Sequence, residues 1–308
     1  MDPYDPRRLP LDEEILNLTG SVNTDMADLT TKRNGGMSDV YSGTFVPVTG
    51  GKVVEVAVKL LRSRDDDQNF KNRLRINREA NAWHRAHHPN ILGLLGVVYF
   101  NGDKVGLVSP LMKNHDAFSY VKQCNEIKKG QIVAGIVKGL QYMHRKGIIH
   151  GDLKLRNILF DDDGTPKICD FGLSRVINLN GYTRATKNES WTYLAPELID
   201  KGRNDDSDSM CLAKWTTKET DIYSLSITAA EVFMEKAHRV HDFKPYEEVV
   251  IQNLRPKKSA INSEKYFPLL EACWKKEPDE RLSIDEIVEW LKVIDNDPRN
   301  GASRNGSS

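Results

Sequence analysis

A short charged segment at residues 150–157 carries the residues whose types and spacing most directly suggest catalysis. Its sequence is His-Gly-Asp-Leu-Lys-Leu-Arg-Asn, so four residues separate Asp152 from Asn157. Apolar residues recur at helical spacing through 129–148, and 158–160 has the pattern of a short buried strand. A charged loop between a helix and a hairpin suits catalytic side chains, because its rigid flanks fix them in position. We therefore expect catalytic side chains in this segment.

Lys59 and Glu79 form a second candidate pair. Lys59 ends the apolar run Val-Ala-Val-Lys at 56–59, which predicts a strand, and Glu79 lies in a predicted helix over 68–86. A lone lysine at the end of a strand usually extends its ammonium group to water. The functional alternative is a phosphate-binding cation that a carboxylate orients, with Glu79 as the partner. Both interpretations stay open on these residues alone.

Asp170 begins an Asp-Phe-Gly sequence directly after an apolar strand. A carboxylate at such a turn is well placed to bind Mg²⁺, which prefers hard carboxylate and amide oxygens. Asp-Phe-Gly by itself is a common turn sequence. It is more specific here, because it follows Asp152 by 18 residues, after Asn157 and a predicted hairpin.

A glycine-containing segment at 33–40 lies just before or at the turn between the first two predicted strands. Backbone amides next to glycine can bind phosphate, since no Cβ blocks a close approach. Of the three glycines in the pattern GxGxxGxV, only Gly35 is in place, and Arg33 and Ser38 occupy the outer positions. The segment also lacks the Gly-Lys-Ser/Thr ending of a P-loop. Alone, it is more typical of a plain hairpin turn.

The composition is that of an ordinary globular protein with one bilobal unit or two small domains. The 308 residues include 44 basic and 44 acidic side chains, which gives no general attraction to nucleic acid or anionic membranes. No apolar run is long enough to insert into a membrane, and the first residues lack the layout of a signal peptide. The four cysteines show no paired spacing, which favours a reduced, cytoplasmic protein.

Strand and helix signals change along the chain. Strands are predicted at 40–46, 53–60, 94–100 and 105–109, with the helix over 68–86 between them, and the remainder is mostly helical. This order predicts an α+β protein with a small antiparallel sheet, one helix packed on it, and a larger helical part. Residues 1–27 are expected to be a lead-in with at most a short helix, 201–216 a polar insert, and 296–308 a disordered tail.

Together these motifs resemble the signature set of eukaryotic protein kinases. The resemblance covers about residues 28–295, and the sequence Cys-Trp…Pro…Arg at 273–281 is typical of the tyrosine kinase and tyrosine-kinase-like groups. The lead-in and the glycine segment are similar to fungal members of the tyrosine-kinase-like group. The motifs occur in the family's order: Val56-Ala57-Val58-Lys59, Glu79, His150-x-Asp152-Leu153-x-x-x-Asn157, Asp170-Phe171-Gly172 and Ala195-Pro196-Glu197.

The resemblance implies a bilobal kinase fold, with a small lobe over 28–110 and a large lobe over 113–295. It implies that Lys59 binds the α- and β-phosphates of ATP and that Glu79 orients it. Asp152 would be the catalytic base that accepts or orients the substrate hydroxyl, and Lys154 would neutralise the γ-phosphate and the attacking oxygen.

The resemblance also implies the cofactors and the nucleotide site. Asn157 and Asp170 would bind Mg²⁺ (or Mn²⁺), and the adenine of ATP would lie between the lobes, next to the carbonyl of Pro110 and the amide of Met112. The resemblance also implies a protein substrate, whose identity the sequence does not reveal. The full set of implied nucleotide contacts is Gly35, Gly36, Val40, Ala57, Lys59, Ser109 at the gatekeeper position, Pro110, Met112, Asp116 near the ribose, Leu159, Asn157 and Asp170.

Two features bear on regulation and on the class of substrate. Gly151 stands where the family usually has an arginine that binds a phosphorylated activation segment, so we predict that activity does not strictly require phosphorylation within 174–192. Lys154, together with Ser190 three residues before Tyr193, matches kinases that act on Ser/Thr, although the Leu-Arg-Asn ending at 155–157 slightly favours tyrosine kinases. Ser/Thr specificity, including autophosphorylation, is the prediction.

Three alternatives remain. A pseudokinase or scaffold that binds nucleotide weakly is favoured only by the incomplete glycine segment, because Lys59, Glu79, Asp152, Asn157 and Asp170 are all present. A dual-specificity or tyrosine kinase fits the same motifs. A small-molecule phosphotransferase is opposed by the Ala-Pro-Glu sequence at 195–197 and by Arg281, which are expected to form an ion pair that supports a peptide platform.

Overall fold

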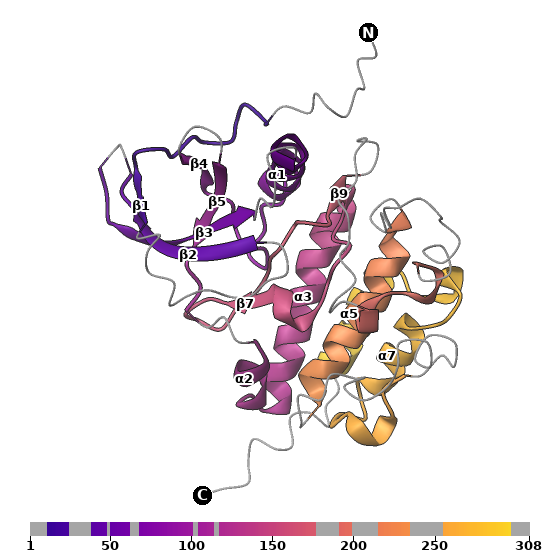
Figure 1. Cartoon of the computed structure of the whole chain (residues 1–308). Helices are drawn as coiled ribbons and strands as arrows, with labels where there is room; N and C mark the ends of the chain where they lie inside the picture. The colour runs from indigo at the N-terminus through magenta and orange to yellow at the C-terminus, as the bar shows by residue number, and fades with distance from the viewer. Residues whose placement is uncertain are drawn as a thin grey trace, which may run out of the picture.

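The protein has a small lobe built on a sheet and a larger lobe built on helices (Figure 1). A computed structural model describes residues 11–24, 38–47, 50–61, 68–100, 104–113, 117–176, 191–198, 215–234 and 255–296. The α+β architecture predicted from the sequence, with a small sheet lobe and a larger helical lobe, is confirmed.

The small lobe is a five-stranded antiparallel sheet in the order β1-β2-β3-β5-β4. Its register brings predicted site residues together, because Val40 on β2 faces Lys59 on β3, and Ala57 on β3 faces Ser109 on β5. Helix α1 shares a hydrophobic core with the sheet through Trp83 and strand residues such as Val97. The elements are β1 (Val22–Thr24), β2 (Ser38–Phe45), β3 (Val54–Leu61), α1 (Gln68–His84), β4 (Gly96–Phe100) and β5 (Lys104–Pro110).

The large lobe is organised around helices α3 and α5. Helix α3 begins at an Asn125 cap, whose side chain accepts a hydrogen bond from the Lys128 amide, and it lies so close to the loop before β4 that a Cβ at Gly139 would be 2.9 Å from the Asn90 carbonyl oxygen. Helix α5 begins at a Thr217–Thr220 capping box and is buried along almost its whole length. The helices are α2 (Ala117–Lys122), α3 (Glu126–Arg145), α5 (Lys218–Phe233), α7 (Phe267–Cys273) and α8 (Ile284–Asp295).

Short elements of the large lobe carry the loop at 150–157 and the Asp-Phe-Gly sequence. Strands β7 and β8 form a hairpin, and β6 pairs with β9. They are β6 (Ile148–Ile149), β7 (Ile158–Phe160), β8 (Pro166–Ile168) and β9 (Arg175–Val176), with 3₁₀ turns η3 (Leu155–Asn157), η4 (Trp191–Tyr193), η6 (Lys258–Ala260) and η7 (Pro278–Glu280).

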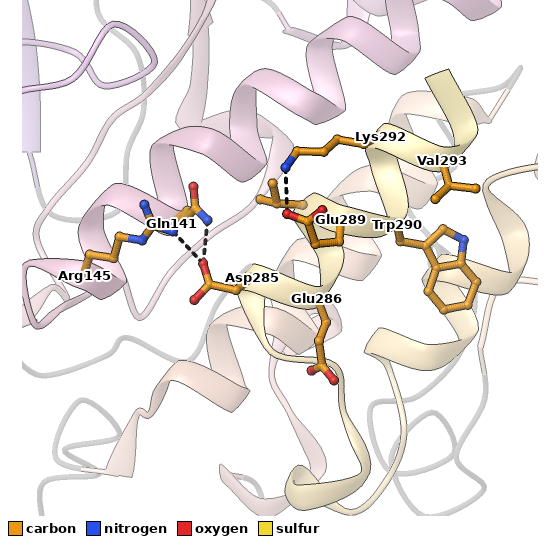
Figure 2. Close-up of a pocket in the computed structure, with 9 residues that line it drawn as sticks. Gln141, Arg145, Asp285, Glu286, Glu289, Trp290, Lys292 and Val293 are labelled. Carbon is orange, nitrogen blue, oxygen red and sulfur yellow. Dashed lines mark hydrogen bonds and ion pairs between the residues drawn. The ribbon is translucent and has the colours of Figure 1, made fainter. Parts of the chain in front are cut away.

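Helix α8 is fastened to α3 by Asp285, which accepts hydrogen bonds from Gln141 (2.5 Å) and Arg145 (2.9 Å) (Figure 2). The pocket drawn in Figure 2 lies at this contact and is also lined by Trp290 and Val293. It contains none of the residues predicted from the sequence to form the active site.

The segment before residue 25 differs from the expected lead-in. Residues 22–24 form β1, the first strand of the sheet, and Ile15 and Leu18 are buried. Alternating burial is too short here to give a strand signal in the sequence. The expected insert at 201–216, apart from its last two residues, and the expected tail beyond Asn296 lie outside the described residues.

None of the helices within the described ranges combines the length and apolar character needed to cross a membrane.

Candidate active site

The side chain of Lys59 joins three separate elements. Its Nζ on β3 lies 2.6 Å from Oε1 of Glu79 on α1 and 2.7 Å from Oδ1 of Asp170, which follows β8. Glu79 is almost fully buried, while Asp170 keeps 40% of its side chain exposed. The lysine therefore does not extend to water as a strand-end lysine ordinarily would.

The charges of this network are fixed by their mutual contact. Burial favours the neutral amine of Lys59, but the carboxylates of Asp170 and Glu79 outweigh this and raise its pKa above the usual range. Burial likewise opposes the charge of Asp170, but the ammonium groups of Lys59 and Lys154 hold the pKa of that carboxyl well below its usual range. Lys59 is thus a permanent cation and Asp170 a permanent anion at neutral pH.

Asp152, Lys154 and Asn157 form a second cluster on the loop after β6. Lys154 Nζ lies 2.8 Å from Asp152 Oδ2, and Asn157 Nδ2 donates to the same oxygen at 3.2 Å and to the Asp152 backbone carbonyl at 2.8 Å. The short 3₁₀ turn η3 brings Asn157 back toward Asp152. Both of these side-chain contacts fall on Oδ2 of the Asp152 carboxylate.

The two clusters are linked by the β7–β8 hairpin. The Cys169 amide donates to the Asn157 carbonyl oxygen at 2.9 Å, and this bond sets Asp170 beside the loop that carries Asn157. Asp170 itself has a positive φ of 67°, which is uncommon outside glycine and turns its carboxylate toward Lys59.

The donor set at this position fits a magnesium ion. Asp170 offers a partly exposed carboxylate, and Asn157 uses its amide nitrogen for the bonds to Asp152, which leaves its amide oxygen as a ligand atom. Mg²⁺ binds through one or two such oxygens and takes the rest of its shell from water and phosphate. No group of three or more His, Cys, Asp or Glu residues suited to another metal occurs among the described residues.

Asp221, at the start of α5, fixes the backbone of the catalytic loop. Its carboxylate, 1% exposed, accepts hydrogen bonds from the amides of His150 (2.8 Å) and Gly151 (2.9 Å) and lies 3.0 Å from His144 Nε2. Buried carboxylates need such donors, because an unpaired buried charge is costly. Sequence reasoning did not assign this role, although an aspartate that opens a strongly apolar helix is a recognisable signal.

His150 and two aromatic residues form a stack beside the loop. The Asp152 amide donates to His150 Nδ1 at 3.2 Å, so Nε2 carries the proton and donates to the Cys169 carbonyl oxygen at 3.1 Å. The Phe171 ring lies 5.9 Å from that imidazole and stacks at 5.6 Å, nearly parallel, on Trp83 of α1. The stack thus packs Phe171, next to Asp170, between the helix that carries Glu79 and the catalytic loop.

The residues expected to contact adenine lie along one side of the sheet and on β7. Val40, Ala57 and Leu159 are half-buried, and Ser109 is buried next to Ala57 in the sheet register. The Leu111 amide donates to the Glu55 carbonyl at 3.0 Å, which fixes the segment that contains Pro110 and Met112. Three further predicted contacts, Gly35, Gly36 and Asp116, lie outside the described residues, as does Ser190.

Glu197 and Arg281 form a bidentate ion pair in the large lobe. The guanidinium nitrogens lie 2.7 and 2.8 Å from the two carboxylate oxygens, and the Arg281 side chain is fully buried. Paired geometry of this kind is specific and strong. It fastens the short helical segment at 196–198, which follows η4, to the C-terminal part of the lobe.

A family model described as protein tyrosine and serine/threonine kinase matches residues 31–291. The chain belongs to this protein kinase family. It is similar to the RGS domain-containing serine/threonine-protein kinase A of Dictyostelium discoideum, with 28% identity over 92% of this chain, and to the proto-oncogene tyrosine-protein kinase ROS of Homo sapiens, with 28% over 95%. It is also 32% identical, over 64% of its length, to the cysteine-rich receptor-like protein kinase 7 of Arabidopsis thaliana.

These relatives are much longer proteins. The chain spans 24%, 13% and 28% of their respective lengths. They include serine/threonine and tyrosine kinases by name. Membership of the family therefore shows a protein kinase domain, while the activity of the protein and its substrate residue are matters for proposal.

Gly151 leads to a prediction about the loop. Its φ is +77°, and a Cβ there would lie 2.8 Å from the Leu173 carbonyl oxygen. Gly50 has nearly the same φ, +78°, but no atom within 4 Å of its Cβ position. Both Gly→Ala variants introduce a strain of about 1–2 kcal/mol, and only Gly151→Ala adds a clash with backbone.

We expect Gly151→Ala to lower the melting temperature and the rate of phosphate transfer more than Gly50→Ala does. Thermal unfolding followed by circular dichroism, together with an initial-rate assay, checks this. Equal melting temperatures and rates for the two variants would show that the loop does not need glycine at position 151.

Proposed function

We propose that the protein transfers the γ-phosphate of ATP to Ser/Thr hydroxyls of a protein substrate, and to itself. The observation that supports this most directly is the contact of Lys59 with both Glu79 and Asp170, at 2.6 and 2.7 Å. A cation fixed in this way is suited to binding phosphate, since it is already oriented before the nucleotide arrives.

In this proposal each polar side chain of the site has one task. Lys59 binds the α- and β-phosphates, and Glu79 keeps its ammonium group in place. The Asp152 carboxylate accepts or orients the substrate hydroxyl through Oδ1, while Lys154, 2.8 Å from Oδ2, neutralises charge near the attacking oxygen.

Asn157 and Asp170 would bind Mg²⁺, and the bound ion supplies neutralisation of the phosphate charge. Val40, Ala57 and Leu159 would enclose the adenine, with Ser109 behind it. The carbonyl of Pro110 and the amide of Met112 would meet its edge, because proline has no amide hydrogen to donate. Gly35, Gly36 and Asp116 would complete the phosphate and ribose contacts.

The choice of Ser/Thr rests on Lys154 and on Ser190. The ion pair between Lys154 and Asp152 supports a cation beside the proposed hydroxyl site, as in the serine/threonine kinases that the catalytic loop resembles. The runner-up is a scaffold that binds nucleotide weakly. It is favoured by Arg33 and Ser38, which replace the outer glycines of the phosphate loop.

Transfer of radiolabelled phosphate tests the proposal. We expect the purified protein to label a generic protein substrate and itself, mostly on serine and threonine, in the presence of Mg²⁺. Asp152→Asn removes the catalytic carboxylate and should lower the rate by at least about 100-fold. Acid hydrolysis and separation of the labelled amino acids identify the residue type.

Absence of transfer above the Asp152→Asn control would favour the scaffold instead. If the label is found mainly on tyrosine, the protein is a tyrosine kinase that uses the same site residues, and the proposed Ser/Thr specificity is wrong.

Activity is also expected without phosphorylation of the segment between Asp170 and Ala195. Gly151 offers no guanidinium to a phosphate group, while Asp221 and the stack of Trp83, Phe171 and His150 already fix the loop. A sample dephosphorylated with phosphatase, and checked by mass spectrometry, should keep the initial rate of a mock-treated sample. Loss of activity after this treatment would contradict the prediction.

A further inference from the structure

Residues 11–24, here called the strap, lie before the part of the chain that the family model matches. Ile15 and Leu18 are each 6% exposed, and they belong to different hydrophobic clusters. Ile15 is part of the main core that includes Trp83 of α1, whereas Leu18 packs with Val58 and other residues on the opposite side of the sheet. The strap therefore contributes to both layers of the small lobe.

The strap crosses the sheet from one edge to the other. Near its middle, the Leu18 amide donates to the Val97 carbonyl oxygen at 2.7 Å, and the Val97 amide donates to the Leu16 carbonyl oxygen at 2.8 Å. The strap ends in β1, which pairs with β2 and forms the edge of the sheet opposite β4 (Figure 1). A Cβ at Gly96 would overlap the Leu16 carbonyl oxygen and come 2.9 Å from Leu18 Cγ, so β4 has room for the strap only with glycine there.

The start of the strap contacts the C-terminal end of α1. The Asp12 amide donates to Asn81 Oδ1 at 2.8 Å, and Asn81 is only 8% exposed. Asp12 also lies 3.7 Å from Arg85. The ion pair between Asp12 and Arg85 is partly exposed to solvent and contributes little to stability. The contact is stabilised mainly by the hydrogen bond to Asn81 and by the burial of Ile15, which contributes about 1.5–3 kcal/mol for a side chain of this kind.

Asn81 is two residues beyond Glu79 on the same helix. We propose that the strap is a positioning element for catalysis, in which Ile15 and Asn81 fix the place of α1 so that Glu79 reaches Lys59. The proposal rests on the phosphate-transfer activity proposed above. In this proposal both residues act through α1 and Glu79, because Asn81 holds the strap on α1 while Glu79 on the same helix makes the contact with Lys59.

A double-mutant cycle tests this role. Ile15→Asn should lower kcat/KM by about tenfold, as expected for coupling between distant sites. Leu16→Asn is the matched control, because Leu16 is adjacent but 62% exposed, and it should change the rate by less than about twofold. In a Glu79→Gln background, Ile15→Asn should lower kcat/KM by less than about twofold, since the ion pair between Glu79 and Lys59 that Ile15 positions is already lost.

Equal effects of Ile15→Asn in the two backgrounds would overturn the proposal, because the strap would then act independently of Glu79. An equal loss of kcat/KM in the Leu16→Asn control would also overturn the proposal. Asn81→Ala removes the side-chain amide that accepts the hydrogen bond from Asp12, and it provides the same cycle if Ile15→Asn does not fold.

Amide hydrogen exchange gives a readout that does not depend on activity. Ile15→Asn should increase exchange in α1 and leave α3 and α5 unchanged, while Leu16→Asn should alter neither. Increased exchange throughout the protein would indicate a merely structural role and contradict the proposal. If the unaltered protein transfers no phosphate, the proposed function fails, whereas the exchange pattern still reports on the strap.

Discussion

A lysine that is largely removed from water keeps its charge only when carboxylates compensate it, and in this protein those carboxylates come from two other parts of the chain. Lys59 on β3 meets Glu79 on α1 and Asp170 after β8, each within 2.7 Å. Since each partner lies on an element with its own packing, the ion pairs form only when sheet, helix and hairpin all occupy their places. In the proposed function, the arrangement that stabilises the lysine also orients it toward phosphate.

The large lobe also contains a buried charge that needs partners, and this charge is negative. The buried carboxylate of Asp221 requires donors, and the backbone amides of His150 and Gly151 supply them. Gly151 meets this demand at a positive φ in a space that has no room for a side chain. Its glycine is therefore required by the geometry of the loop, apart from any consequence for binding a phosphorylated segment.

Much of this site was predictable from the sequence because its parts are local. Asp152, Asn157 and Asp170 were identified from short motifs, and the strands and α1 from their hydrophobic periodicity. The roles of Asp221 and of the strap were not predicted, because each depends on contacts between residues far apart in sequence. Asn81 and Asp12 are 69 residues apart, and Gly151 and Asp221 are 70 apart. No periodic pattern encodes such pairs.

Calorimetric titration with ATP, with and without Mg²⁺, tests the central claim that Lys59, Glu79 and Asp170 form one nucleotide site. The account predicts that Mg²⁺ tightens ATP binding to the unaltered protein, that Asp170→Asn removes this dependence on Mg²⁺, and that Glu79→Gln weakens binding in both conditions. ATP affinity that is the same with and without Mg²⁺, or unchanged in both variants, would contradict it.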